Sequence, residues 1–234
     1  MEASSVPQPV AYVVQFLLSN GFVSRSDLKR ALKTVNEKFG LENDNKLGLR
    51  FVEEKAASYF YAIGMELREV RDDLEEGEQC YVLVDTADFD ELENHDLMEY
   101  MPSMQLKKLV EILFSDPRCQ GTDPSQLSES EFPAKEELLT KLVEDKYVFR
   151  SIEEGRHGVL FPGTRMLYSL EPYLAEEYGG KTLFKCLGCH KWLLKGRLCH
   201  NQQCPGRLHD RCYDAFFTSQ EVQPGICTLC NSEL

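Results

Sequence analysis

Hydrophobic positions recur with helical spacing through residues 10–63, and three helices are expected there. The first is an apolar run that begins at Val10 and stops before Asn20-Gly21, a pair typical of a helix C-terminus. Ser24 is a good N-cap for the second helix, whose apolar positions recur every three or four residues: Leu28, Leu32, Val35 and Phe39. The third helix, over residues 48–63, has a buried stripe of its own: Phe51, Val52, Ala56, Tyr59, Phe60 and Ile63.

The pattern then changes toward extended structure. The segments MELREVR and QCYVLVD flank an acidic loop over residues 72–77 and together predict a β-hairpin. Three helices followed by a hairpin is the order of a winged-helix domain. We assign residues 1–100 to this first domain, with residues 1–9 as a flexible leader and residues 85–99 as an acidic connector.

A similar series begins again after Pro102. MQLKKLVEILF and PAKEELLTKLVEDKY are amphipathic helices, and Asp123 followed by Pro124 is typical of a helix start between them. Residues 147–149 and 159–161 predict a second hairpin. A closing helix from Thr164 should break or kink at Pro172. We assign residues 101–180 to a second winged-helix domain, which ends at a Gly-Gly pair.

Cysteines dominate the pattern from residue 181 onward. Seven of the nine cysteines and one histidine form four pairs with metal-ligand spacing: Cys186 with Cys189, Cys199 with Cys204, His209 with Cys212, and Cys227 with Cys230. Two thiolates on one tight turn can occupy two corners of a tetrahedral zinc site, and a second pair completes it. Four pairs therefore predict two Zn²⁺ ions, which residues 181–234 need because they are too few to bury a self-sufficient core.

The pairing of these turns has two solutions. A sequential arrangement joins neighbouring pairs, whereas an interleaved cross-brace joins the first pair with the third and the second with the fourth. The loop lengths favour the cross-brace, which assigns Cys186, Cys189, His209 and Cys212 to zinc one, and Cys199, Cys204, Cys227 and Cys230 to zinc two. The neighbouring His190 and His200 are expected to stay outside both sites. Closed sites leave no open coordination position, so we expect no catalytic residue here.

The composition of the chain indicates the class of protein and the cellular compartment to expect. The chain of 234 residues is 42% hydrophobic and 28% charged, ordinary values for a soluble globular protein. No apolar run approaches the roughly 18 residues that span a bilayer, so no membrane association is expected. The start, MEASSVPQPV, lacks the features of a secretory signal. A cytosolic or nuclear protein with reduced thiols is expected, in which clustered cysteines bind metal.

The net charge of −13 is unevenly spread. Residues 181–234 have more basic than acidic side chains, so the acidic excess lies in the remaining chain. A negative surface repels phosphate, and direct DNA binding is expected to be weak or absent. The candidates for such a contact are Arg150, Arg156 and His157 around the second hairpin. A protein partner agrees better with this charge.

Two kinds of zinc module share the ligand order of four cysteines, one histidine and three cysteines. One is the RING-like ubiquitin-ligase module, and the other is the PHD finger, a chromatin reader. A PHD finger usually has an aromatic residue two positions before its seventh ligand, where this chain has Gly225. The aromatic residues that could build a reader's cage are few, chiefly Phe184, Trp192 and Tyr213. The RING-like module is favoured, and the PHD-type reader is the weakest alternative.

Five segments are characteristic of one family: KCLGCHKWLLKG, LCHNQQCPGRLHDRCYDAFF, ICTLC, MELREVRDDLEEGEQCYVLV and LVEDKYVFRSIEEGRHGVLFPGTRML. On these segments the chain resembles the RING-like non-SMC element one subunits of SMC-type DNA-repair complexes over nearly its whole length. The resemblance implies an α+β fold of two tandem winged-helix domains followed by a small two-zinc cross-brace RING-like module. It also implies a nuclear subunit that binds a MAGE-type partner through its winged helices, contacts a kleisin and promotes ubiquitin transfer.

Such a ligase subunit acts by holding a ubiquitin-charged conjugating enzyme in a reactive geometry. Candidates for docking that enzyme are apolar residues around the first and last metal loops: Leu187, Trp192, Phe216 and Leu229. Packing in the module's own core is an equally good explanation for Phe216. Gly188, Thr228 and Asn231 depart from residues that RING domains often have. We therefore expect weak activity that the partner raises, and the alternative is a non-catalytic, zinc-stabilised scaffold for protein–protein assembly.

Overall fold

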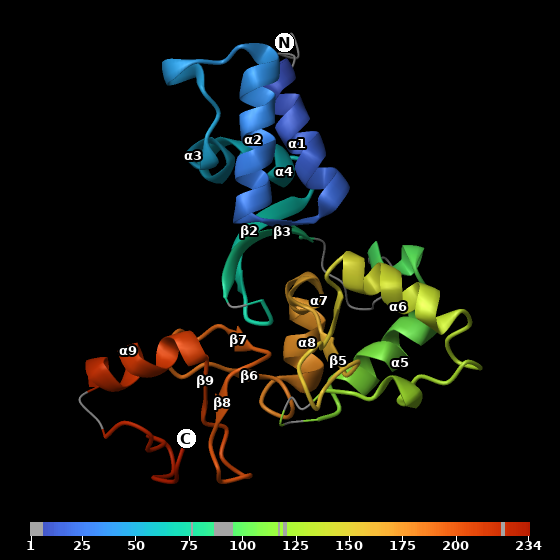
Figure 1. Ribbon diagram of the computed structural model, residues 1–234, viewed down its shortest axis with the longest axis vertical. Helices are drawn as coiled ribbons and strands as arrows, with labels where there is room; N and C mark the ends of the chain where they lie inside the picture. The colour runs from blue at the N-terminus through green and yellow to red at the C-terminus, as the bar shows by residue number, and fades with distance from the viewer. Residues whose placement is uncertain (1–6, 76, 87–95, 117, 119–120, 221–222) are drawn as a thin grey trace. The chain divides into compact units, whose positions relative to one another are not determined.

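The computed structural model is a mixed α and β protein (Figure 1), described here over residues 7–75, 77–86, 96–116, 118, 121–220 and 223–234. Residues 1–6 of the expected leader and residues 87–95 of the expected acidic connector lie outside this description. The chain divides into two compact units. The first comprises Met1–Asp72 and Glu78–Asp88, and the second comprises Asp73–Gly77 and Phe89–Leu234.

The helices of the first unit follow the predicted pattern. Helix α1 (Gln8–Asn20) ends at Gly21, whose φ of +65° suits glycine. Helix α2 (Arg25–Phe39) begins where the Ser24 hydroxyl accepts a hydrogen bond from the Asp27 backbone N–H at 3.0 Å. After a 3₁₀ turn, η1 (Asn43–Asn45), the third helical stretch runs through α3 (Leu49–Phe51), the π-helical turn η2 (Val52–Ala56) and α4 (Ala57–Tyr61).

A three-stranded antiparallel sheet completes this unit, in the order β1-β3-β2. The predicted hairpin is β2 (Met65–Asp72) and β3 (Glu78–Asp85), with Met65 opposite Asp85 at one end and Asp72 opposite Glu78 at the loop. The added strand β1 (Phe22–Ser24) is too short to show an alternating pattern. Helices and sheet enclose one core: Val13, Leu17, Val23, Leu28, Leu32, Val35, Val52, Ala56, Phe60, Tyr81 and Leu83.

The second unit begins with the other predicted winged helix. After η4 (Asp96–Glu99) come α5 (Ser103–Leu113), α6 (Lys135–Glu144), and the paired strands β4 (Val148–Arg150) and β5 (Leu160–Pro162). The closing helix is broken in two, α7 (Thr164–Ser169) and α8 (Glu171–Tyr178), with Pro172 in the first turn of α8 as its missing N–H requires. The helix start expected at Asp123 is a single 3₁₀ turn, η5 (Pro124–Gln126).

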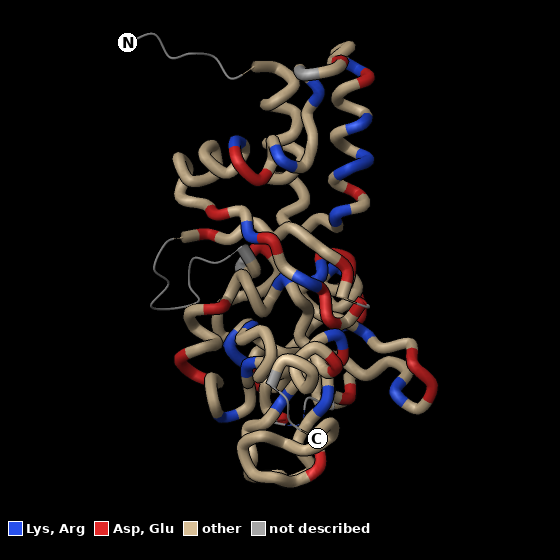
Figure 2. The backbone as a smooth tube through the Cα atoms, turned by 90° about the vertical axis from the view of Figure 1, so that its left-hand side faces the viewer, with Lys and Arg blue, Asp and Glu red and all other residues tan. Residues whose placement is uncertain are grey.

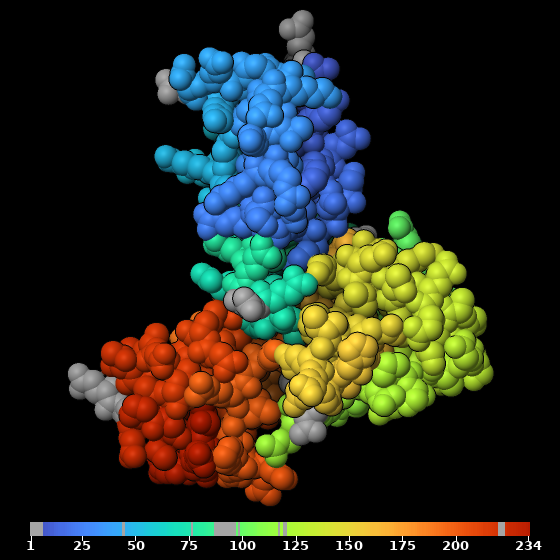
Figure 3. Space-filling model, in the orientation of Figure 1, coloured from blue at the N-terminus to red at the C-terminus, as the bar shows by residue number. Residues whose placement is uncertain are grey.

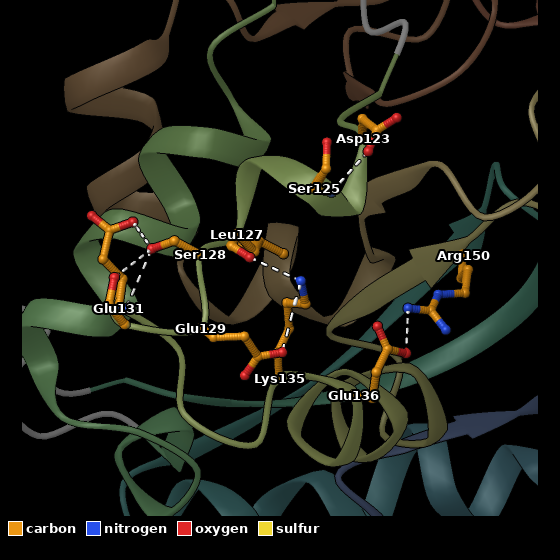
Figure 4. A network of polar contacts seen from close by, with 10 residues as sticks. Asp123, Ser125, Leu127, Ser128, Glu129, Glu131, Lys135, Glu136 and Arg150 are labelled. Carbon is orange, nitrogen blue, oxygen red and sulfur yellow. Dashed lines mark hydrogen bonds and ion pairs between the residues drawn. The ribbon is translucent and has the colours of Figure 1, made fainter.

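Polar contacts join the first turn of α6 to a neighbouring loop and to β4 (Figure 4). The ammonium of Lys135 donates to the Leu127 carbonyl at 3.0 Å, and the guanidinium of Arg150 lies 3.1 Å from the Glu136 carboxylate. In the described part of the backbone, acidic and basic residues occur close to one another in many places (Figure 2). The carboxylate of Glu136 offsets the charge of Arg150. The Arg150 side chain therefore attracts phosphate only weakly.

The core of the second unit extends into the cysteine-rich segment. Leu183, Trp192 and Leu194 belong to the same buried cluster as Leu170 and Leu174 of the winged helix. The space-filling view shows the winged helix in green and yellow and the cysteine-rich segment in orange and red (Figure 3).

The domain boundary expected at Gly179-Gly180 stays a prediction. No helix among the described residues is long and apolar enough to cross a membrane.

Candidate metal centre

Short hairpins place the metal ligands. Strands β6 (Phe184–Lys185) and β7 (Trp192–Leu193) flank the first ligand pair, and strands β8 (Arg197–Leu198) and β9 (Arg207–Leu208) flank the second. The third pair lies where β9 leads into helix α9 (Asp210–Gln220). The fourth pair lies on a tight C-terminal turn. In that turn the Cys227 backbone N–H donates to the Ser232 carbonyl at 2.7 Å and the Asn231 N–H donates to the Cys227 carbonyl at 2.9 Å.

The eight ligand candidates gather in two groups of four. The donor atoms of each group lie within 4.8 Å of one another. One group is Cys186, Cys189, His209 and Cys212, and the other is Cys199, Cys204, Cys227 and Cys230. The grouping is interleaved, because each group joins two pairs that are not neighbours in the sequence.

Donor type and spacing fit tetrahedral zinc. The Sγ atoms of Cys199 and Cys230 are 3.4 Å apart, and those of Cys204 and Cys227 are 3.6 Å apart. A disulfide needs about 2.05 Å, and none of the described cysteines forms one. A tetrahedral site with Zn–S bonds of about 2.3 Å separates its sulfurs by roughly 3.8 Å. The two four-ligand clusters therefore fit two zinc ions, which confirms the cofactor predicted from the sequence.

In the first site, the two ring nitrogens of His209 have different surroundings. Nδ1 lies 3.3 Å from the Cys189 sulfur and 3.8 Å from the Cys212 sulfur. Nε2 lies 2.7 Å from the Asp73 carboxylate and 3.1 Å from the Trp192 carbonyl. Both of these groups accept hydrogen bonds, so Nε2 carries the proton and Nδ1 presents its lone pair to the metal position.

Local hydrogen bonds also shift the pKa values of two ligands in the first site, His209 and Cys186. Burial lowers the pKa of His209, but its hydrogen bonds with Asp73 and Cys186 raise that pKa to about 10, so a metal that binds Nδ1 must displace a proton from that atom. Burial raises the pKa of the Cys186 thiol, yet hydrogen bonds from His209 and from nearby backbone N–H groups lower it to about 6. Cys186 therefore favours the thiolate form that a metal needs. Asp73 could not be recognised as part of this site from the sequence, where it is one of several acidic residues in a hairpin loop.

The second site is made of sulfur alone and is tightly enclosed. Burial raises the pKa of Cys199 to about 12 and also raises that of Cys204. Crowded, buried thiolates of this kind need the charge of a bound cation. Gly206 is packed against them, and a Cβ atom at this position would lie 2.6 Å from the Cys227 sulfur. Only glycine fits there without moving a ligand.

The two other histidines of this segment are outside both groups. His190 is exposed on the turn between β6 and β7. The Nδ1 atom of His200 lies 3.3 Å from the Glu233 carboxylate. Neither histidine replaces a cysteine in the two clusters.

The four candidates for docking a conjugating enzyme differ in exposure. Leu229 is 54% exposed, Leu187 is partly buried, and Trp192 and Phe216 are only 8% and 9% exposed. The indole N–H of Trp192 donates to Glu171 of α8 at 2.7 Å. Trp192 and Phe216 thus pack inside the protein, and the docking role of the set stays a prediction.

Cationic side chains cover the aromatic rings that could form the methyl-lysine cage of a chromatin reader. Arg207 lies over the Phe184 ring at 4.3 Å, Arg197 lies over the Tyr213 ring at 3.8 Å, and Lys185 lies over Trp192 at 4.5 Å. A cage for methylated lysine needs open ring faces. This arrangement argues against the PHD-type alternative.

Comparisons with known proteins agree with this structure. A family model described as a RING-like domain matches residues 186–230. The "Non-structural maintenance of chromosomes element 1" protein of Saccharomyces cerevisiae (strain ATCC 204508 / S288c) is 36% identical over 69 residues, which are 30% of this chain and 18% of the yeast protein. A chain of a solved "Nse1-Nse3-Nse4 complex" superposes with a TM-score of 0.69 at 20% identity, covering 98% of this chain and 97% of that one.

Together these findings confirm the resemblance to the non-SMC element one family and the predicted fold class. The likeness to the solved chain covers nearly all of both chains, and at 20% identity it establishes the fold. The sequence match reaches less than a fifth of the yeast protein.

Proposed function

We propose that this chain, with its fold and RING-like zinc module similar to non-SMC element one proteins, is a RING-type ubiquitin ligase subunit of an SMC-type complex. The observation that carries the proposal is the pair of interleaved four-ligand clusters within the RING-like segment. We further propose that the complex acts in DNA repair in the nucleus. A MAGE-type protein and a kleisin are the proposed partners, and the likeness to a chain solved within a complex of three named subunits supports the proposal that this chain has two partners.

The proposed mechanism is positioning, since neither cluster has an open position for catalysis. Bound zinc supplies structure by holding the metal-binding turns together. Leu187 and Leu229 lie on the first and last of these turns, and both retain exposed surface. We infer that they contact the conjugating enzyme, whose ubiquitin thioester is attacked by a substrate amine. Holding the two reactants in a reactive geometry is the subunit's contribution.

A ubiquitination assay tests this proposal. Purified full-length chain is incubated with a panel of charged conjugating enzymes, with and without the MAGE-type protein. We expect zinc-dependent ubiquitin chains that the MAGE-type protein increases. Leu229→Ala should reduce chain formation at least tenfold while two zinc ions per chain are retained, as native mass spectrometry measures. His190→Ala, on an exposed residue of the same module, is the matched control.

The alternative is a zinc-stabilised scaffold without transferase activity. The burial of Trp192 and Phe216 favours it, because it leaves a smaller apolar surface for a conjugating enzyme. Absence of ubiquitin chains with every enzyme and partner tested, in a preparation that holds two zinc ions, would exclude the ligase proposal. Retained binding of the MAGE-type protein in that preparation would then support the scaffold.

A further inference from the structure

The loop between β2 and β3 places three consecutive side chains in the second unit. The Asp73 carboxylate lies 2.7 Å from Nε2 of His209. Leu74 packs against the cluster of buried residues that includes Leu170 and Trp192. The Glu75 carboxylate lies 2.6 Å from the Lys146 ammonium. The loop thus contacts the metal module, the hydrophobic core and the winged helix of the second unit within three residues.

We propose that Asp73 is a positioning residue of the first zinc site, although it lies far from the ligands in sequence. Its carboxylate accepts a hydrogen bond from the Nε2–H of His209, which keeps the proton on Nε2 and Nδ1 directed at the metal. Histidine ligands of metal sites commonly donate their second ring N–H to such a carboxylate, which fixes the tautomer and makes the ligand more basic. The second group consists of four cysteines, so it has no ring nitrogen for a carboxylate to orient.

The geometry supports a specific interaction. The His209 and Asp73 side chains are 1% and 8% exposed. A carboxylate at this depth must be paired, and it also forms an ion pair with Arg211. The Trp192 carbonyl accepts from the same nitrogen at a longer 3.1 Å, but it is neutral. The charged acceptor makes the stronger hydrogen bond.

Occupancy of the first site and docking of the loop should therefore be coupled. A metal ion that holds the His209 ring in place also strengthens the contact of Asp73 with that ring. By reciprocity, docking of the loop strengthens metal binding by the same free energy. Zinc in the first site would stabilise residues 73–75 in their contacts, whereas zinc in the second site would not. The inference concerns zinc binding and is independent of ubiquitin transfer.

Zinc release from the full-length chain tests the proposal. Transfer of zinc to a chromophoric chelator is followed for the wild type, Asp73→Ala and Asp73→Asn. We expect one of the two ions to leave about 10–100-fold faster in Asp73→Ala, with a smaller effect in Asp73→Asn. Cobalt substitution identifies the affected ion, since absorption bands differ between three-sulfur, one-nitrogen and four-sulfur sites. Unchanged release of both ions from Asp73→Ala would overturn the proposal.

Two further variants separate positioning of the imidazole from simple loop docking. Glu75→Gln removes the negative charge from the ion pair of the same loop with Lys146 and should leave release from the first site near the wild-type rate. In a His209→Cys background there is no ring to orient, so adding Asp73→Asn should not accelerate release. Equal acceleration by Glu75→Gln, or acceleration by Asp73→Asn in the cysteine background, would contradict the positioning role.

Hydrogen exchange measures the coupling directly. Protection of the loop at residues 73–75 should fall when zinc is removed from the wild type. The protection should fall much less when zinc is removed from a chain that already has Asp73→Ala. Loop protection that is independent of zinc in the wild type would refute the coupling.

Discussion

The two metal sites use similar ligands but differ in what surrounds them. The first adjoins a hydrophobic cluster that includes Leu193, Leu208 and Phe217, and its histidine contacts a carboxylate from a distant hairpin loop. The second is surrounded mainly by its own cysteines and Leu234. One zinc site is therefore connected to the rest of the second unit, and the other links the β8–β9 hairpin to the C-terminal turn. Two zinc sites with similar ligands can thus differ in how much of the surrounding structure they stabilise.

Removal of both ions should give the largest effect. Structural zinc contributes about 10–16 kcal/mol of apparent binding free energy in small peptides, so a strong chelator should unfold residues 181–234. The core of the second unit should loosen too, because Leu183, Trp192 and Leu194 belong to it. Trp192 is the chain's one tryptophan, so its fluorescence reports this change. Hydrogen exchange in α1 and α2 should stay unchanged, and an unaltered tryptophan spectrum would contradict the expected loosening.

A substitution beside each site sharpens the comparison. Trp192→Ala removes a large buried side chain next to the first site and should lower the free energy of unfolding by about 3–5 kcal/mol. Leu229→Ala, on an exposed residue of the second site, should change it by no more than about 0.5 kcal/mol. Urea denaturation of the zinc-loaded proteins measures both. Similar losses in the two variants would show that the sites are equally integrated.

A loss of stability smaller than that of Trp192→Ala tests how tightly the second site is packed. Gly206→Ala places a methyl group against the Cys227 sulfur and should cost about 1–3 kcal/mol by overpacking. Faster release of zinc from the second site only should accompany that cost. Gly188→Ala is the matched change in the first site, where the nearest atom would be at 3.3 Å. Zinc release as fast from Gly188→Ala as from Gly206→Ala would show that the first site is as tightly packed as the second.

Features set by neighbouring residues could be predicted from the sequence. Ser24 and Gly40 bound α2 because a hydroxyl caps one end and a left-handed glycine caps the other. Pro172 separates α7 from α8 because it lacks the backbone N–H that a continuous helix requires. Spacing also indicated which side chains could bind metal, because two ligands on one turn need no long-range information.

Features that depend on long-range contacts could not be predicted. Nothing near Asp73 in the sequence distinguishes it from Asp72 or from the other acidic residues of the loop. Trp192 was a docking candidate as an apolar residue near the first metal loop, and its burial in the core and its hydrogen bond to Glu171 depend on residues remote in sequence. Strand β1 forms only because β3 offers it an edge for pairing. Each of these outcomes requires the position of a partner that is remote in sequence.

The hairpin loop has a consequence for the order of events during synthesis. Arg211, which pairs with Asp73, lies 138 positions further along the chain. At about 5–20 residues per second, the ribosome needs roughly 7–28 seconds to cover that interval. The first unit has time to form its sheet while Asp73 still lacks the imidazole and the guanidinium. Zinc capture at the first site is thus a late step in maturation, and a nascent chain that stalls before residue 209 leaves this carboxylate exposed to solvent.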